Sequence, residues 1–220
     1  MNNVKSFFTP IRILAAIVFI LILTGAIVFQ LPILNALPLL ISTVVMFLQA
    51  RVNRYAFLLG GINALLYTVA YAQMTLYSSA AYALLVSFPL QLITFFNWQR
   101  HTSNNSTEIR TISAFGRILL FAGMGGLWLL LFLIFSAFSS AYLIFDNTVS
   151  VLGIVATLLC AGRFAEFTMI QWVSSLVSIA TYTIMTIDDP SRCVWLIHVL
   201  YSCTCSIITY ITIRKKEKNQ

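Results

Sequence analysis

Long apolar runs, separated by short polar segments, make up most of the chain. Eight runs follow one another, and they cover residues 13–30, 33–49, 55–72, 76–98, 118–138, 142–161, 167–187 and 192–213. A helix of roughly 20 apolar residues crosses the hydrocarbon core of a bilayer. The pattern therefore predicts an all-α polytopic membrane protein with eight transmembrane helices.

The composition excludes the main alternatives to a membrane protein. The chain is 60% hydrophobic and only 9% charged, whereas soluble domains carry roughly 25% charged residues. A soluble enzyme, a disordered chain and a separate extramembrane domain are therefore excluded. The first run is longer than the apolar core of a signal peptide, which has about 7–15 residues, and Gln30-Leu31-Pro32 is no cleavage site. We expect this run to remain as a helix.

The positive charges lie almost entirely on one side of the predicted topology. The net charge is +7, and the termini and the loops on their side carry 12 of the 13 Lys and Arg residues. Arg192 is the exception. This asymmetry predicts that both termini are cytoplasmic, and it explains the charge without a nucleic-acid partner. The acceptor-like stretch Asn104-Asn105-Ser106 falls in a basic loop, so we do not expect glycosylation there.

Six runs carry polar side chains at helical spacing, whereas the first and the fifth are almost purely apolar. Steps of three, four, seven and eleven residues put each polar set on one helix face. Polar groups in hydrocarbon are costly without partners or water, so we expect the six faces to enclose a shared polar cavity. Hydrogen bonds between neighbouring helices are the alternative. The sets are Ser42 and Thr43; Gly60, Asn63, Tyr67 and Tyr71; Ser87, Gln91, Thr94 and Trp98; Asp146, Ser150 and Thr157; Gln171, Ser174, Ser175, Ser178 and Tyr182; and His198, Ser202, Cys205 and Thr209.

The order of the runs indicates an internal repeat: one apolar, three polar, one apolar, three polar. We expect an N-terminal helix (1–30), a first three-helix bundle (31–100), a loop and linker helix (101–140), and a second three-helix bundle with a basic tail (141–220). A single linker span gives both bundles the same orientation, which is a parallel repeat about an axis along the membrane normal. Such repeats place the substrate between them near the midplane.

Several stretches resemble the PnuC family of vitamin-precursor transporters, over about residues 33–215. The resemblance lies in Gly61-Ile62-Asn63-Ala64-Leu65-Leu66-Tyr67, Leu76-Tyr77, Pro89-Leu90-Gln91, Asn97-Trp98-Gln99-Arg100, Phe145-Asp146, Arg163, Glu166 and Trp172. It implies a 3+1+3 core similar to a covalently joined SWEET pair, preceded by one extra helix, in a bacterial plasma membrane. It also implies facilitated diffusion of nicotinamide riboside, which a separate cytosolic kinase would trap, or of thiamine, riboflavin or deoxynucleosides in sister branches.

One feature of the seventh run leaves the vitamin open. Nicotinamide-riboside members of the family typically carry a second Trp and a nearby Asn on this helix. Here Trp172 is the only Trp, and Ser174 or Ser175 takes the Asn position.

A riboside offers a π-face and ribose hydroxyls, so its site needs aromatic rings with amide or hydroxyl partners. We expect Trp172 to stack on the ring, with membrane packing as the alternative. Asn63 and Gln91 can both donate and accept hydrogen bonds, which suits ribose hydroxyls; the alternative is an Asn–Gln bond between helices. The other residues expected to line the path are Tyr67, Tyr71, Ser175, Tyr182 and His198.

Four further residues have ordinary structural roles as well as functional ones. His198 could couple protons, but we expect a neutral, hydrogen-bonded ring. Asp146 is expected to be an N-cap, and Glu166 to pair with Arg163 or with a helix N-terminus. Pro89 removes an amide hydrogen two residues before Gln91, which predicts a hinge, or alternatively a static bend.

Signatures of catalysis are absent from the sequence. There is no GxxxxGK[ST], HExxH or GxSxG motif, and Cys203-Thr204-Cys205 has no metal-ligand spacing. We therefore expect no catalytic residue, metal or cofactor, and a uniporter for a small vitamin precursor within the lipid bilayer. A selective channel and a structural membrane subunit are the alternatives, and association into a homo-oligomer stays open.

Overall fold

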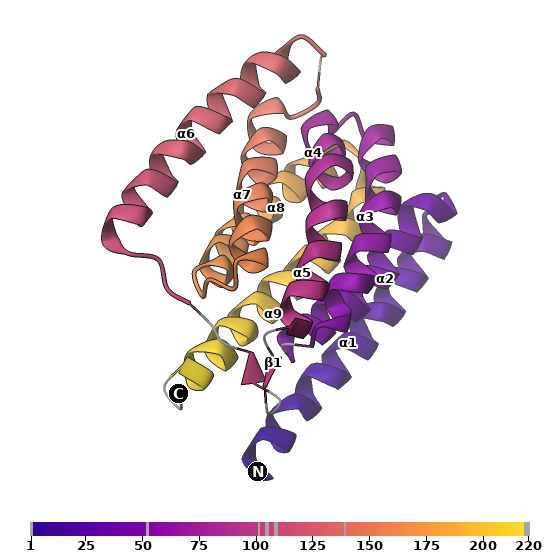
Figure 1. Cartoon of the computed structure of the whole chain (residues 1–220). Coiled ribbons are helices and arrows are strands. Elements are labelled where there is room, and N and C mark those ends of the chain that lie inside the picture. Colours follow the sequence, from indigo (N-terminus) through magenta and orange to yellow (C-terminus); the bar gives the residue numbers. More distant parts are fainter. Residues whose placement is uncertain are drawn as a thin grey trace.

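The computed structural model is a bundle of membrane-length helices with both termini at one end (Figure 1). It describes the backbone of residues 2–51, 53–100, 102–103, 106–107, 110–138 and 140–217, and the side chains of 11–51, 53–98, 110–138 and 140–214. Eight helices in these ranges are long and apolar enough to cross a membrane, which confirms the prediction of eight spans. The Asn104-Asn105 pair lies outside the described residues.

The helix bounds agree with the apolar runs to within a few residues, with two exceptions. The first helix extends well ahead of its apolar run, and the fourth span is broken into three segments. The elements are α1 (Asn2–Val28), α2 (Ile33–Ala50), α3 (Tyr55–Gln73), α4 (Tyr77–Tyr82), a π-helix η1 (Ala83–Ser87), α5 (Phe88–Arg100), the short antiparallel strands β1 (Thr102–Ser103) and β2 (Ser106–Thr107), α6 (Ala114–Ser136), α7 (Leu143–Ala161), α8 (Phe167–Asp188), a 3-10 turn η2 (Pro190–Arg192) and α9 (Cys193–Glu217).

Pro89 explains the break in the fourth span. A proline inside a helix has no N–H, and its ring collides with the carbonyl four residues earlier. The chain accommodates it with the wider π-turn, in which the Phe88 N–H donates to the Ala83 carbonyl five residues back. The predicted irregularity is therefore present beside Gln91, whereas movement about it remains a prediction.

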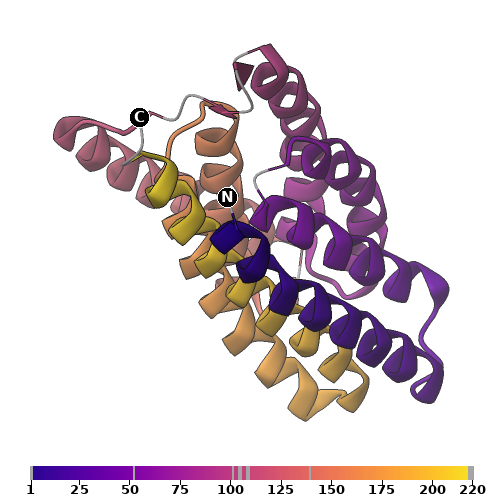
Figure 2. The ribbon, with the colours of Figure 1, turned by 90° about the horizontal axis from the view of Figure 1, so that it is seen from below.

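The two halves of the chain have matching contacts. In the first half α3 contacts α2, α4 and α5, and in the second half α8 contacts both α7 and α9. The halves meet along two seams, α2 against α9, and α4, η1 and α5 against α7. The remaining helices cover these seams, because α1 packs on α2 and α9 while α6 packs on α7 and α4. Figure 2 shows α1 (indigo) lying along α9 (yellow).

The two covering helices differ in how closely they pack. A Cβ on Gly25 of α1 would lie 2.7 Å from Val194 Cγ2, so glycine permits a close approach to α9. Val18 and Ile22 of α1 are buried in the core beneath. By contrast, α6 has no buried residue, and it is tied to α7 by two hydrogen bonds of Trp128, whose indole donates to Thr148 Oγ1 at 3.0 Å and whose carbonyl accepts from Asn147 Nδ2 at 2.8 Å.

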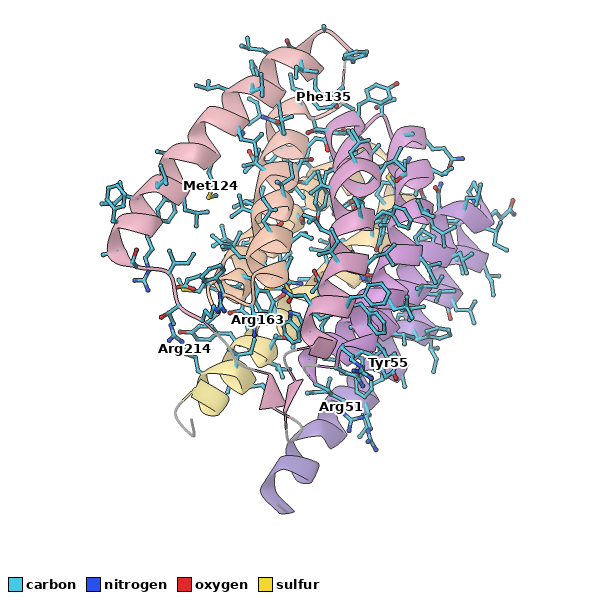
Figure 3. All side chains as sticks on the ribbon, in the orientation of Figure 1. Arg51, Tyr55, Met124, Phe135, Arg163 and Arg214 are labelled. Carbon is cyan, nitrogen blue, oxygen red and sulfur yellow. The ribbon has the colours of Figure 1, made fainter. Side chains whose placement is uncertain are left out.

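Asp146 is a cap, but it does not cap its own helix. Its Oδ2 accepts from the Ser78 N–H at 3.0 Å, and its Oδ1 accepts from the Ser79 N–H at 3.1 Å and the Ser79 hydroxyl at 2.5 Å. These groups belong to the first turn of α4, on the other half of the molecule. The carboxylate therefore joins the two halves at the end of the bundle opposite the termini. We name this end the outer end and the other the basic end, near which Figure 3 shows Arg51, Arg163 and Arg214.

At the outer end, the turn between α8 and α9 holds the lone Arg192. Its Nε lies 3.0 Å from Asp189 Oδ2, and Asp189 Oδ1 accepts from the Ser191 N–H. Hydrogen bonding to Ser191 and the charge of the Arg192 guanidinium hold the pKa of the Asp189 carboxyl below its ordinary value.

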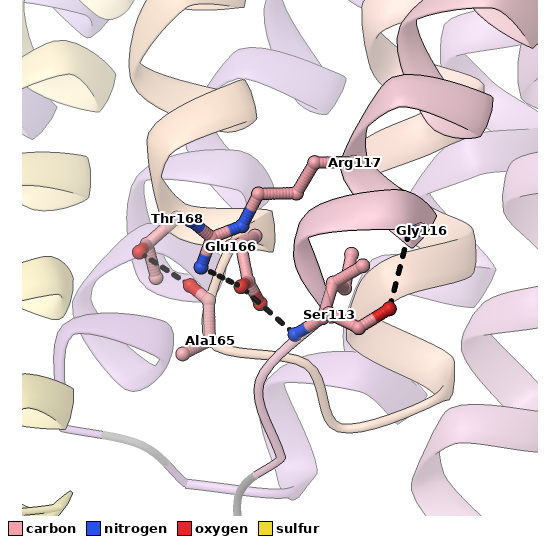
Figure 4. A network of polar contacts seen from close by, with 7 residues as sticks. Ser113, Gly116, Arg117, Ala165, Glu166 and Thr168 are labelled. Carbon is pink, nitrogen blue, oxygen red and sulfur yellow. Dashed lines mark hydrogen bonds and ion pairs between the residues drawn. The ribbon is translucent and has the colours of Figure 1, made fainter.

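A clamp at the basic end fastens the segment before α6 to the turn between α7 and α8 (Figure 4). The Arg110 N–H donates to the Arg163 carbonyl at 2.8 Å, and the Ala165 N–H donates to the Arg110 carbonyl at 2.9 Å. Glu166 Oε1 accepts from the Ile112 N–H at 2.9 Å and from Arg117 Nη2 at 3.1 Å. The sequence predicted that Glu166 pairs with Arg163 or with a helix N-terminus. In the structure it pairs with Arg117, which lies in the first turn of α6.

Variants of this clamp should separate its ion pair from its backbone hydrogen bond. The Arg117 side chain is 54% exposed and that of Glu166 only 15%, so Arg117→Met should lower the free energy of unfolding by about 0.5 kcal/mol. Glu166→Gln keeps an acceptor for Ile112 and should cost as little, whereas Glu166→Ala should cost about 1 kcal/mol more. Thermal unfolding in detergent measures this, and equal losses in all three variants would contradict it.

Candidate substrate cavity

A cavity of about 260 Å³ lies between the two halves. Its walls come from α2, α3, the broken fourth span, α7, α8 and α9, and no described residue of α1 or α6 lines it. The six helices are those whose polar faces were predicted to meet, so the expectation of a shared polar cavity is confirmed. Figure 3 shows side chains of these helices filling the space between the ribbons.

Most of the predicted site residues line this cavity. They are Asn63, Tyr67, Tyr71, Gln91, Ser175, Tyr182 and His198. Pro89 does not line it, but the π-turn beside it brings Ser87 and Gln91 to the wall. The polar sets were less uniform than expected, because five of their members lie off the cavity: Thr43, Trp98, Ser150, Cys205 and Thr209. Trp98 instead donates its indole N–H to the Cys160 carbonyl at 3.0 Å.

The expected stacking residue, Trp172, is not in the cavity wall. Successive helix residues are rotated by about 100°, so with Gln171 facing the cavity, Trp172 points to the side and is 39% exposed. The tryptophan that lines the cavity is Trp195, which is only 1% exposed. Its spacing of three residues from His198 and seven from Ser202 puts it on the same face of α9, and this spacing is the signal that could have identified it.

Trp195 is the centre of an aromatic wall near the outer end. Its ring stacks on that of Tyr182, with centroids 5.5 Å apart and planes at 24°. Tyr67 meets it edge-on at 5.8 Å, and Tyr71 stacks on Tyr67 at 5.1 Å. Four rings from α3, α8 and α9 thus form one side of the cavity, which suits a planar ligand.

In Asn63 and Gln91 the amide nitrogen is used in a hydrogen bond within the protein, whereas the amide oxygen is not. Asn63 Nδ2 donates to the Pro38 carbonyl at 3.0 Å, and Gln91 Nε2 donates to Ser87 Oγ at 2.8 Å. The alternative of an Asn63–Gln91 bond is therefore not what the structure has. Asn63 Oδ1 and Gln91 Oε1 are buried and have no partner among the described residues. Both are hydrogen-bond acceptors for a ligand.

Two further polar atoms of the wall are unpaired within the described residues. Trp195 Nε1 and His198 Nε2 are both buried without a hydrogen-bond partner there, so the expected internal bond of the His198 ring is missing at this nitrogen. Buried polar groups almost always have a partner, in the protein or in bound water or ligand. The side chains of the lining therefore hold two acceptors, a donor and an imidazole nitrogen whose hydrogen-bonding capacity is unused within the described residues.

A second, much smaller cavity adjoins this one toward the basic end. Gln49, Phe57 and Phe167 line both cavities, of which the smaller is about 10 Å³. Gln171 Nε2 donates to Gln49 Oε1 at 3.4 Å across the same region. These side chains from α2, α3 and α8 close the cavity on that side.

The charges around the cavity are few and of one sign. Asp146, at the outer end, contributes a carboxylate to the lining, and among the described lining residues there is no lysine or arginine. No group of three or more His, Cys, Asp or Glu side chains in the described ranges is placed to hold a metal ion. The arrangement is therefore suited to binding a small polar aromatic molecule, and its lining offers no assembled metal centre.

Comparison with known proteins identifies the family. The family model described as "Nicotinamide mononucleotide transporter" matches residues 32–215. The solved structure titled "Crystal structure of the Vitamin B3 transporter PnuC" superposes with a TM-score of 0.81 at 17% sequence identity, and covers 96% of this chain and 93% of that one. No curated protein sequence matches the chain. Because the family model spans most of the chain, the chain belongs to the PnuC family of vitamin-precursor membrane transporters.

Proposed function

We propose that this transporter takes up nicotinamide riboside by facilitated diffusion. The observation that carries the proposal is that four side chains lining the cavity each hold a buried polar atom with no partner within the described residues. A ligand with hydroxyl and carboxamide groups supplies partners for such a set. The residues proposed to form the site are Asn63, Tyr67, Gln91, Ser175, Tyr182, Trp195 and His198.

Nicotinamide riboside matches the chemistry of this wall. Its ribose hydroxyls can donate to Asn63 Oδ1 and Gln91 Oε1, and its carboxamide oxygen can accept from Trp195 Nε1. Its pyridinium ring is positively charged, and aromatic faces attract cations. The volume of about 260 Å³ lies at the small end of ligand pockets, which suits a ligand no larger than a nucleoside.

The cavity favours the riboside over the mononucleotide that gives the family model its description. A phosphate monoester carries between one and two negative charges at neutral pH and is normally held by Arg, Lys or a helix N-terminus. The described lining holds neither cation, and its one carboxylate has the wrong sign. Binding the phosphate would leave these charges without compensation.

A ligand panel on purified protein tests the substrate. Nicotinamide riboside should raise the melting temperature, because a ligand that binds only the folded state stabilises it by mass action. Nicotinamide mononucleotide should produce no shift at the same concentration. Thiamine, riboflavin and a deoxynucleoside complete the panel, and a shift with one of these and none with the riboside would assign a different vitamin.

Two tryptophans give a matched control for the site. Trp195→Phe removes the indole donor but keeps an aromatic ring, and it should weaken riboside binding about tenfold, as expected for one lost hydrogen bond. Trp172→Phe should leave the affinity unchanged, because Trp172 lies outside the cavity. If Trp172→Phe weakens riboside binding and Trp195→Phe does not, Trp172 is the residue that stacks on the ligand.

Two adjacent glycines test the position of Gln91. A Cβ on Gly60 would lie 1.9 Å from Gln91 Oε1, whereas one on Gly61 would make ordinary van der Waals contacts, with Leu92 Cδ2 at 3.4 Å and Gln91 Cβ at 3.7 Å, and would not reach the carboxamide. Gly60→Ala should therefore displace the carboxamide and weaken riboside binding about tenfold, as expected for the loss of one hydrogen bond, with a melting temperature near that of the parent. Gly61→Ala should bind like the parent. Isothermal titration distinguishes them, and equal affinities would remove Gln91 from the site.

The matching contacts of the two halves support a transport cycle by alternating access. Equivalent helices are α1 and α6, α2 and α7, α3 and α8, and the broken fourth span and α9, as their contact partners indicate. We propose that the two three-helix bundles, at 31–100 and 141–220, are related as in a SWEET-like parallel repeat and rock about the shared cavity. The π-turn at Pro89 would act as a hinge, and Gln49, Phe57 and Phe167 would form the inner gate.

Transport is proposed to be passive. A coupled carrier needs a group that binds the driving ion and releases it on the other side, and the carboxylate of the lining, Asp146, is already held by hydrogen bonds from Ser78, Ser79 and Ser140. Accumulation would then depend on a separate cytosolic kinase that phosphorylates the riboside.

Liposome transport tests the absence of coupling. With the membrane potential clamped, nicotinamide riboside should reach equal concentrations on both sides, and a pH or sodium gradient should drive no accumulation. The clamp is needed because a cation distributes with voltage even through a uniporter. Uphill uptake under a proton gradient, abolished in His198→Gln, would overturn passive transport and make His198 the coupling residue.

We propose a multi-pass location in the bacterial plasma membrane, as the family resemblance implies, with both termini cytoplasmic, as the charge asymmetry supports. Both termini lie at the end of the bundle near Arg51, Arg163 and Arg214 (Figures 1 and 3). With this orientation the outer end, where Asp146 lies, faces the outside of the cell and the basic end faces the cytoplasm.

A further inference from the structure

We propose that Asp146 makes the cavity select positively charged vitamin precursors over uncharged ones of the same shape. This inference rests on the proposed function, because it concerns the same cavity. It assigns charge selection to one residue at the outer end, separate from the amide and indole groups that recognise the hydroxyl and carboxamide groups of the ligand.

Both oxygens of Asp146 accept hydrogen bonds, as the oxygens of an ionised carboxylate do. Each oxygen accepts one backbone N–H, from Ser78 and from Ser79, and each accepts one hydroxyl, from Ser140 at 3.1 Å and from Ser79 at 2.5 Å. Backbone N–H groups can only donate, and hydrogen bonds to the charged form favour ionisation. The residue is 1% exposed and contributes to the cavity lining together with Ser79.

No cation neutralises this carboxylate in the part of the chain that the structure describes. The ion pairs found there join Arg117 with Glu166 and Arg192 with Asp189, neither of which lines the cavity. The partners of Asp146 are dipoles, namely peptide groups at the start of the fourth span and serine hydroxyls. The cavity therefore has one negative charge beside it and no formal positive charge in its described lining.

The hydrogen-bonding groups of the wall cannot provide this selection. Asn63, Gln91 and Trp195 are neutral, and their hydrogen bonds are the same for a charged and an uncharged ring. A unit charge at a separation of about 10 Å and an effective dielectric constant of about 20 changes binding by roughly 15-fold. The aromatic wall adds cation–π attraction, so the charged form should bind more tightly, and the part that depends on Asp146 should disappear when its charge is removed.

A pair of ligands that differ in charge but hardly in shape tests the proposal. Nicotinamide riboside is a cation, and its reduced dihydro form is uncharged with the same ribose and carboxamide. Isothermal titration on the full-length protein in detergent should find the cation bound at least tenfold more tightly. In Asp146→Asn, which keeps one oxygen to accept an N–H and suits a cap position, affinity for the cation should fall about tenfold while affinity for the reduced form stays.

A second variant separates charge from capping. Ser79→Ala removes one hydrogen bond to the carboxylate but keeps its charge, so it should retain the preference for the cation. Equal weakening of both ligands in Asp146→Asn and in Ser79→Ala would make Asp146 a structural cap alone and overturn the proposal. The unmutated protein tests the proposal even if Asp146→Asn does not fold. If the unmutated protein binds the reduced form as tightly as the cation, or more tightly, the proposal is overturned.

The outcomes distinguish this proposal from the choice of vitamin. If neither nicotinamide form binds and thiamine does, the substrate proposal fails, and the charge test is made with thiamine, a cation, and its uncharged 3-deaza analogue, with the same expected results. If the protein binds only riboflavin or deoxynucleosides, which are uncharged, both proposals fail. Binding of both nicotinamide forms with equal affinity leaves the substrate class standing and overturns the role of Asp146.

Discussion

A polar group within the bilayer must find its partner inside the protein, and this constraint organises the whole molecule. Most hydroxyls satisfy it locally, as when Thr43 donates to the Leu39 carbonyl and Thr94 to the Leu90 carbonyl, each four residues back. The Asn63 amide instead donates to the Pro38 carbonyl on a different helix, and its oxygen has no partner among the described residues. The side chains that line the cavity carry several of these unpaired polar atoms, and the atoms define which ligands it can bind.

The same reasoning separates what the sequence could reveal from what it could not. Length, hydropathy and helical period are local properties, and they were sufficient for the eight spans and for the faces that carry Asn63, Gln91 and Tyr182. The partner of a side chain depends on packing between distant segments. Asp146 was recognised as a cap, but that it caps α4, 67 or 68 residues earlier in the chain, required the fold, as did the pairing of Glu166 with Arg117.

The tryptophan assignment shows the limit within a single helix. Trp172 and Gln171 are neighbours in sequence, and a helix turn sends neighbours to different faces, so a polar residue beside a tryptophan is evidence against their sharing a cavity. Trp195 had the right spacing relative to His198, but it stands near the start of its span, where aromatic residues ordinarily mark the membrane interface. Its burial against Tyr182 follows from the way α8 and α9 pack, which no local pattern encodes.

The two seams between the halves differ in what a rearrangement would break. The seam between the fourth span and α7 is hydrogen-bonded along its length, by Asp146 with Ser79 at the outer end, Tyr82 with Thr157 at 2.9 Å, and Asn97 with the Ala161 carbonyl at 2.6 Å at the basic end. Across α2 and α9 the described side chains make two polar contacts, from the Tyr201 hydroxyl to the Thr43 carbonyl at 3.3 Å and from the Ser202 hydroxyl to the Met46 sulfur at 3.4 Å, with apolar packing elsewhere. Hydrogen bonds broken within a bilayer find no replacement in lipid, whereas dispersion contacts can be exchanged for contacts with acyl chains. The energetic cost of opening is therefore lower along α2 and α9, and the hydrogen-bonded seam is the natural pivot.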